Sequence, residues 1–178
     1  FLAERYPHIY QRVLKRIKEG RWEADGSTWL EPDTNIPNGE SLTRQFLYGL
    51  EFFKHKLFSS PQVLWLPDTF GYSSALPQIM KGFNIKNFMT TKISWNDTNR
   101  MPHDTFYWRG IDGSQILTYF ITTIEPKADF NNPNQWKYTY NGQITPHTVL
   151  GAYHVYSDKL INNKLLLSYG YGDGGGGP

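Results

Sequence analysis

The sequence predicts an α/β fold built around a largely parallel sheet. Amphipathic helical segments alternate along the chain with short runs of apolar residues, and no internal repeat is visible. Such alternation is typical of βαβ units, in which helices cover the faces of a parallel sheet. Of the 178 residues, 39% are hydrophobic, which is enough for one domain with its own core.

The helices are predicted from apolar side chains spaced three and four residues apart. Residues 4–19 are the first such segment, and residues 40–58 are the clearest. Asn38 is the expected N-cap of the second helix because its side chain can accept a hydrogen bond from the first helical turn. Residues 74–83 and 149–156 are expected to form two further helices.

The strands are predicted from short apolar or β-branched runs that end at turn residues. Residues 63–66 and 87–91 are expected to be strands of the parallel sheet. Residues 106–109 and 115–120 flank the sequence GIDGS and predict a hairpin. Residues 164–169 are expected to be a final buried strand. Two stretches rich in Pro, Gly or Asn, residues 22–38 and 125–146, are expected to be irregular.

Composition excludes several classes of protein. The net charge is only +2, from 18 basic and 16 acidic residues, so an affinity for nucleic acid is not expected. There is no cysteine, which excludes disulfides and thiolate metal sites and fits a cytoplasmic protein. No long apolar run predicts a membrane span, and no signal peptide is visible.

Both ends of the sequence look internal to a longer protein. Phe1 opens directly into a helical pattern, and the chain closes on the glycine run 174–177. We therefore expect residues 1–178 to be part of an α/β domain that is truncated at both ends. An engineered flexible tail is the alternative explanation of the glycines.

Asp68 lies where the apolar run 63–66 ends, next to several aromatic residues. Side chains that do chemistry on parallel sheets lie just beyond the carboxyl ends of the strands. Trp65, Phe70 and Tyr72 would surround the carboxylate, and a buried charge without a partner is costly. Aromatic rings stack on sugars and carboxylates bind hydroxyl groups, so we interpret the segment as a sugar site. A turn or a helix cap is the alternative.

Asp173 holds the equivalent position after the predicted strand 164–169. The glycines around it would let a ligand approach the backbone, but no Gly-Lys-Ser/Thr follows, so a phosphate loop is not indicated. A plain flexible loop is the alternative. The 5 histidines form no close pair, so the chain by itself holds no complete zinc site. Asp68 would supply at most one ligand to a site completed elsewhere.

Several motifs in consistent order resemble a known family. Residues 65–73 (WLPDTFGYS) look like the nucleophile segment of glycoside hydrolase family 38, the α-mannosidases. The other matching segments are 29–41 (WLEPDTNIPNGES), 44–49 (RQFLYG), 92–96 (KISWN), 102–106 (PHDTF), 108–114 (WRGIDGS) and 170–178 (GYGDGGGGP). The upstream segments are similar to those of bacterial members, and the resemblance covers almost the whole chain.

The resemblance implies part of the N-terminal catalytic domain of an exo-α-mannosidase. Its fold would be an irregular, seven-stranded-type β/α barrel, present here as an incomplete segment. The enzyme would release terminal α-D-mannosyl residues from mannose-containing oligosaccharides with retention, through a covalent mannosyl-enzyme. It would depend on a divalent metal, usually zinc, that binds substrate hydroxyls and stabilises charge. The oligomeric state of the parent is left open, a homo-oligomer included.

The resemblance also implies roles for single residues. Asp68 would be the nucleophile and a metal ligand, and Asp173 is the candidate general acid/base. The residues expected at the sugar are Phe70, Tyr72, Trp29, Asp33 and Lys92, with a structural loop role as the alternative for Trp29 and Asp33. The family's His-x-Asp pair and a later histidine ligand have no counterpart here. We therefore expect these 178 residues alone to bind zinc weakly or not at all and to be inactive.

Two other functions compete with this interpretation. A metal-dependent polysaccharide deacetylase has a related barrel, but it would need paired histidine ligands, which the segment lacks. A non-catalytic carbohydrate-binding module would explain the 6 Trp and 12 Tyr residues. Such modules are mostly β-sandwiches, and the helical pattern of residues 40–58 argues against one.

Overall fold

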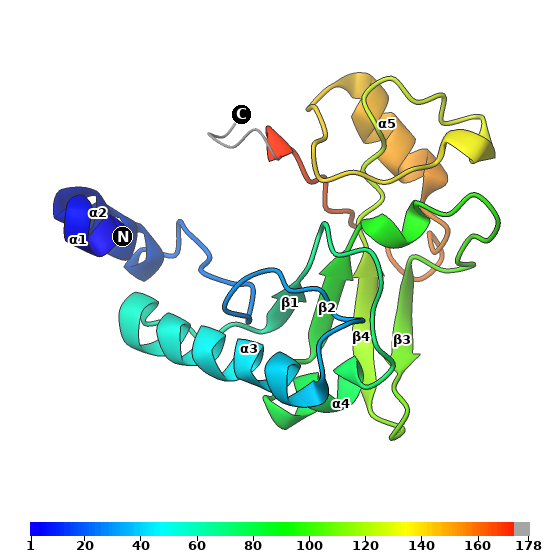
Figure 1. Ribbon diagram of the computed structural model, residues 1–178. Helices are drawn as coiled ribbons and strands as arrows, with labels where there is room; N and C mark the ends of the chain where they lie inside the picture. Colours follow the sequence, from blue (N-terminus) through cyan, green and yellow to red (C-terminus); the bar gives the residue numbers. More distant parts are fainter. Residues whose placement is uncertain (173–178) are drawn as a thin grey trace.

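The computed structural model describes residues 1–172 and shows one mixed sheet with helices beside it (Figure 1). The strands are β1 (Val63–Trp65), β2 (Asn87–Thr90), β3 (Thr105–Arg109) and β4 (Gln115–Phe120), in the spatial order β1-β2-β4-β3. The pairs β1–β2 and β2–β4 are parallel, whereas β3 and β4 form the predicted antiparallel hairpin. The prediction of a largely parallel sheet is thus confirmed only in part. The described strands do not close into a barrel.

The helices follow the predicted pattern, with one change of type. They are α1 (Leu2–Arg5), α2 (Pro7–Lys18), α3 (Gly39–Phe52), α4 (Leu76–Gly82) and α5 (Pro146–Val155), with short turns η1 (Phe53–Leu57), η2 (Lys92–Ser94) and η3 (Pro133–Gln135). The side chain of Asn38 accepts a hydrogen bond from the Ser41 N–H at 2.9 Å, so the predicted N-cap is confirmed. The last turn of the predicted helix 40–58 is a π-helix that ends at Leu57, and the next residue, Phe58, has a φ of +53°.

Two hydrophobic clusters hold the chain together. The larger joins the sheet to α3 and α4 and contains Phe46, Leu64, Leu66, Leu76, Met80, Ile85, Phe88 and Ile116. The smaller lies under the segment that follows β4 and contains Phe120, Ile124, Ala128, Tyr138 and Val155. This second cluster places α5 and the irregular segment beyond the carboxyl ends of the parallel strands (Figure 1). Both clusters therefore border the sheet edge at which a site is expected.

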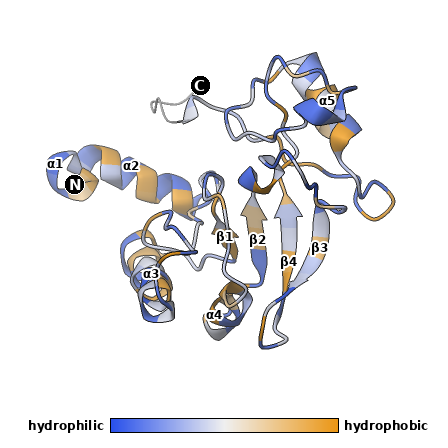
Figure 2. Ribbon diagram, turned by 45° about the vertical axis from the view of Figure 1, so that its right-hand side comes forward, coloured by the Kyte–Doolittle hydropathy of each residue, from blue (hydrophilic) through white to orange (hydrophobic). Residues whose placement is uncertain are grey.

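Helix α2 has an apolar face that the described part of the protein leaves unburied. Residues of α2 have the predicted amphipathic spacing, but none of them is buried. Figure 2 shows the apolar residues of α2 on a helix that stands away from the sheet. A 2.5 Å hydrogen bond from the Tyr10 hydroxyl to the Lys56 carbonyl joins α2 to the π-helix that follows α3. Within residues 1–172, no helix is long and apolar enough to cross a membrane.

The predicted final strand 164–169 is wrong. No strand forms there, and Leu166 and Tyr169 are 39% and 52% exposed. The sheet gives the run no free neighbour near β4, because β4 already pairs with β2 on one side and β3 on the other. Its amides bind side chains instead, as when the Ser168 N–H donates to the Thr123 hydroxyl at 2.9 Å. The apolar run therefore joins no strand of the sheet, and Tyr169 forms an isolated bridge with Gly142 instead.

Candidate active site

Three segments meet beyond the carboxyl ends of β1 and β2. The loop after β1 carries Asp68, the turn after β2 carries Lys92, and the irregular segment before α3 carries Glu31 and Asp33. Glu31, Asp33, Asp68, Thr69 and Phe70 line a cavity of about 220 Å³. Because β1 and β2 are parallel neighbours, their carboxyl ends are adjacent. The loop that carries Asp68 and the turn that carries Lys92 therefore lie side by side.

Asp68 has a charged partner that the sequence did not reveal. The Lys92 Nζ lies 3.0 Å from the Asp68 Oδ1. The Lys92 side chain is 19% exposed and that of Asp68 is 44% exposed, so the pair is partly shielded from water. The Lys92 ammonium also lies 4.2 Å from the centre of the Trp95 ring and 5.4 Å from that of Tyr140. Two aromatic faces and one carboxylate therefore fix the position of this cation.

The backbone of the Asp68 loop is held by side chains from both neighbouring segments. Glu31 Oε1 accepts hydrogen bonds from the N–H groups of Asp68 at 2.6 Å and Thr69 at 2.8 Å. The Thr34 hydroxyl donates to the Gly71 carbonyl at 2.5 Å, and the Thr91 hydroxyl donates to the Pro67 carbonyl. Sequence reasoning did not single out Glu31, although the matching motif 29–41 contains it. The loop is thus fixed on both sides.

Tyr72 points into the protein and not toward the cavity. Its hydroxyl bonds to the Leu66 carbonyl at 3.1 Å, to the Thr69 carbonyl and to the Thr90 hydroxyl. Burial raises the pKa of the Tyr72 hydroxyl well above its usual value. The ring packs edge-to-face on Phe88, with centroids 4.8 Å apart. This geometry makes Tyr72 a support beneath the loop and does not favour the predicted contact with the sugar.

Phe70 and Asp33 line the same cavity as Asp68. The Phe70 side chain is 78% exposed and so presents a free ring face beside Asp68. Asp33 is exposed, and its Oδ1 accepts hydrogen bonds from the N–H groups of Ile36 and Asn35, which lower its pKa. Asp33 therefore carries a negative charge that also orders its own turn. The aromatic enclosure expected around Asp68 is wrong, because Phe70 faces solvent and Tyr72 faces the core.

Trp29 and Asp173 are not brought to this cavity by the described structure. The Trp29 ring packs edge-to-face on Phe52 of α3 at 5.6 Å and lines a separate cavity with Tyr48 and His55. Its predicted place at the sugar is therefore not supported by the geometry. Asp173 lies outside the described residues, and the strand that was expected to position it is absent from residues 164–169.

The described residues do not make up a metal site by themselves. Within residues 1–172, no group of three His, Asp or Glu side chains could hold a metal ion. Asp68 Oδ1 is already paired with an ammonium, and a single carboxylate falls short of the four ligands typical of zinc. His147 is engaged elsewhere, with its Nε2 2.9 Å from the Ala128 carbonyl. A metal at Asp68 would need further ligands from outside these residues.

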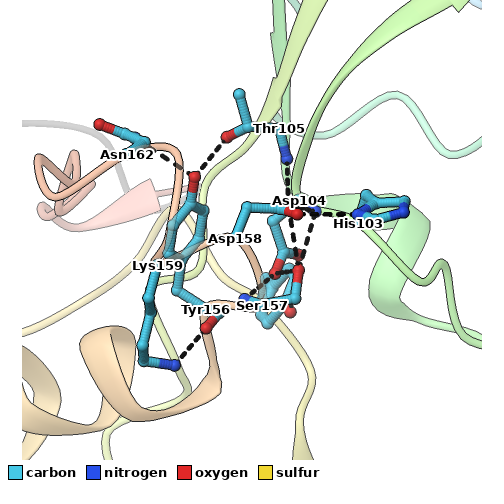
Figure 3. A network of polar contacts seen from close by, with 9 residues as sticks. His103, Asp104, Thr105, Tyr156, Ser157, Asp158, Lys159 and Asn162 are labelled. Carbon is cyan, nitrogen blue, oxygen red and sulfur yellow. Dashed lines mark hydrogen bonds and ion pairs between the residues drawn. The ribbon is translucent and has the colours of Figure 1, made fainter.

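A second polar cluster joins the start of β3 to the segment after α5 (Figure 3). Asp158 Oδ2 accepts hydrogen bonds from the N–H groups of Asp104 at 2.7 Å and Thr105 at 2.8 Å, and its Oδ1 lies 2.7 Å from His103 Nδ1. The buried Asp104 carboxylate accepts bonds from the Ser157 N–H and from the Tyr138 hydroxyl. These hydrogen bonds link residues 103–105 at the start of β3 to residues 157–158 after α5, and we call this cluster the clasp.

Comparison with known proteins identifies the family. Residues 1–178 match the model of the glycosyl hydrolases family 38 N-terminal domain. The chain is 43% identical over 175 residues to alpha-mannosidase G of Dictyostelium discoideum, covering 98% of this chain and 15% of that protein. It is 41% identical over 178 residues to alpha-mannosidase 2C1 of Homo sapiens, covering 100% of this chain and 16% of that protein. The chain thus spans 15–16% of the length of these relatives.

Solved structures agree at the level of the fold. An alpha-mannosidase from Enterococcus faecalis V583 aligns with a TM-score of 0.60 at 20% identity, over 94% of this chain and 18% of that one. A 4-alpha-glucanotransferase from Thermococcus litoralis aligns with a TM-score of 0.56 at 16% identity, over 67% of this chain and 19% of that one. The family match over the whole chain and the two relatives above 40% identity show that the chain belongs to glycoside hydrolase family 38, in its N-terminal domain.

Proposed function

We propose that these residues are part of the catalytic domain of a longer, retaining exo-α-mannosidase. The observation that carries the proposal is the placement of Asp68. Its carboxylate lies at the carboxyl end of a parallel strand, on the wall of a cavity, with a loop backbone held from two sides. The relatives that match the whole chain are named as alpha-mannosidases. The substrate class is therefore a mannose-containing oligosaccharide with a terminal α-D-mannosyl residue.

In the proposed reaction Asp68 is the nucleophile. One carboxylate oxygen attacks the anomeric carbon while the bond to the leaving oxygen breaks, and a covalent mannosyl-enzyme forms. Water then attacks the same carbon, the bond to the Asp68 oxygen breaks, and the sugar leaves with its original configuration. The proposed general acid/base, Asp173, would protonate the leaving oxygen in the first step and deprotonate the water in the second.

Lys92 and Phe70 support the nucleophile in this proposal. Lys92 keeps one oxygen of Asp68 engaged at 3.0 Å, which orients the carboxylate. The exposed Phe70 ring offers an apolar face on which a pyranose ring can stack. These roles are supported by the position of Phe70 on the cavity wall and by the ion pair of Lys92 with Asp68.

The proposal includes a divalent metal, with zinc as the expected ion. Asp68 would contribute one ligand, and the remaining ligands would come from outside residues 1–172, since these lack a complete set. When bound, such an ion would supply positive charge next to the sugar hydroxyls. A cytoplasmic location is part of the same proposal, based on the absence of cysteine.

The proposal is tested by Asp68→Ala in the full-length protein, with p-nitrophenyl α-D-mannoside as substrate. Loss of a nucleophile is expected to lower kcat by about 10³-fold or more. Asp97→Ala is the matched control, because the Asp97 side chain is 92% exposed and its ion pair within residues 1–172 is a 3.5 Å contact with Lys137. Turnover by Asp68→Ala at the wild-type rate, or no turnover by the wild-type protein, would contradict the proposed function.

A further inference from the structure

Glu31 lies directly against the backbone of the proposed nucleophile. Its Oε1 accepts the N–H of Asp68 at 2.6 Å and the N–H of Thr69 at 2.8 Å, and the Thr69 hydroxyl lies 3.3 Å away. We infer that Glu31 is a positioning residue that sets the direction of the Asp68 side chain. The inference rests on the proposed function, because it presumes that Asp68 reacts.

The hydrogen bonds fix the part of the loop that aims the carboxylate. The two N–H groups belong to adjacent, nearly planar peptide units on either side of the Asp68 Cα, so their orientation determines where Cβ points. Hydrogen bonds to a carboxylate are short and strong, and the observed 2.6 and 2.8 Å agree with that class. The Thr69 residue is only 8% exposed, which leaves its N–H little access to water as a replacement partner.

The other side chains on this loop act at different atoms. Thr34 binds the Gly71 carbonyl, Thr91 binds the Pro67 carbonyl, and Tyr72 binds the Leu66 carbonyl. In the described part of the chain, Glu31 is the side chain recorded as a partner of the Asp68 N–H. The three hydroxyl groups bind carbonyl groups of the loop, the Thr69 carbonyl included, whereas Glu31 binds the two N–H groups on either side of the Asp68 Cα.

Two different roles for Glu31 can be separated by the chemistry of its replacements. If Glu31 acts as a hydrogen-bond acceptor, what matters is the position of its Oε1. The side-chain oxygen of Gln can occupy the same position, whereas the carboxylate of the shorter Asp cannot reach it. As a charge next to the cavity, or as a direct sugar ligand, it acts through its negative charge, which Asp retains and Gln removes. Because the Glu31 residue is exposed, either change is expected to leave the hydrophobic core intact.

The test measures kcat/KM in the full-length protein, together with the inhibition constant of mannose as a readout of sugar binding. A nucleophile displaced by about 1 Å costs on the order of 100-fold in rate, so Glu31→Ala and Glu31→Asp are expected to lower kcat/KM about 10- to 100-fold. Glu31→Gln is expected to stay within about threefold of wild type, because its amide oxygen keeps both hydrogen bonds. Mannose inhibition is expected to be unchanged in all three variants.

The matched control is Glu23→Ala, since Glu23 is exposed and has no hydrogen bond or ion pair recorded with residues 1–172. If Glu31→Asp is active and Glu31→Gln is not, charge carries the effect and the inference is overturned. Wild-type rates for Glu31→Ala, or a loss of mannose binding in every Glu31 variant, would overturn it too. A wild-type protein without turnover would instead refute the proposed function. Unchanged melting temperatures would confirm that the variants are folded.

Discussion

Asp68 and Lys92 form a partly shielded ion pair at the candidate site. The sequence suggested a carboxylate enclosed by aromatic rings, for which an unpaired charge would be expensive. The structure instead pairs Asp68 with Lys92 at 3.0 Å and leaves the carboxylate 44% exposed. The aromatic residues around the pair, Trp95 and Tyr140, lie on the cation and not on the anion. The turn after β2 therefore supplies the charged partner of the Asp68 carboxylate.

Lys92→Met is expected to lower kcat/KM of the full-length protein about tenfold. A charge-assisted hydrogen bond contributes about 1.5–3 kcal/mol, and the exposure of Asp68 reduces this toward the lower end through solvent screening. Lys92→Arg is expected to retain more activity, because it keeps a cation near Asp68. The measurement is turnover of p-nitrophenyl α-D-mannoside. Equal rates for Lys92→Met and wild type would show that the ion pair does not orient the carboxylate.

At the scale of the elements, the clasp of Figure 3 connects β3 to the end of α5. Burial by itself would raise the pKa of the Asp158 carboxyl. Hydrogen bonds from His103 and from the N–H groups of Thr105 and Asp104 outweigh this effect and leave the pKa below the ordinary 3.8. A depressed pKa means that the ionised carboxylate stabilises the folded state. This contribution is complete above the unfolded-state pKa and is lost as the pH falls through the lower folded-state value.

Asp158→Ala is therefore expected to remove the shared acceptor of the Asp104 and Thr105 amides at neutral pH, which leaves the Asp104 N–H with the Ser157 hydroxyl at 3.1 Å. The loss of two hydrogen bonds to a largely buried carboxylate costs about 1–3 kcal/mol, or roughly a tenfold or greater loss of amide protection. Hydrogen exchange of the full-length protein, followed by mass spectrometry, measures this locally. The difference from wild type is expected to shrink as the pH falls below the Asp158 pKa. Equal protection at neutral pH would contradict the role of the clasp.

The elements also show where local sequence patterns were sufficient. The N-cap at Asn38 and the hairpin around residues 110–114 depend on a few neighbouring residues, and both were predicted correctly. Burial of the apolar face of α2 and strand formation at residues 164–169 depend on which partners exist in three dimensions. The helix formed as predicted but has no buried residue, and the strand prediction was wrong. Periodicity reports which face of a segment is apolar, but it cannot report whether another element covers that face.

At the scale of the whole molecule, the candidate site is assembled from segments far apart in sequence. Asp68, Asp33, Phe70 and Lys92 could be singled out from the motifs, because the motifs are local. Glu31 lies 37 residues from the amide that it binds, and the Asp68–Lys92 pair crosses two strands. Such pairings need the register of the sheet and so could not be derived from spacing alone.

The metal-dependence proposal makes a prediction for the protein and for the segment. A chelator such as EDTA is expected to abolish the α-mannosidase activity of the full-length protein, and added Zn²⁺ is expected to restore it. Residues 1–178 alone are expected to show no tight zinc binding in isothermal titration calorimetry, because residues 1–172 lack a group of three ligands. Sub-micromolar zinc binding by the segment, or full activity in the presence of chelator, would contradict the respective prediction.

The hydrogen bonds that fix the backbone of the Asp68 loop also have a consequence for the order of folding. The loop carbonyls and amides are bound by Glu31, Thr34 and Thr91, which lie on segments that must first be brought together by long-range contacts. Local helices such as α3 can form early, whereas contacts of high sequence separation form slowly. During refolding, the geometry of the Asp68 loop is thus completed only after the strands have paired and the flanking segments have docked beside it. Recovery of activity is expected to trail recovery of helical structure.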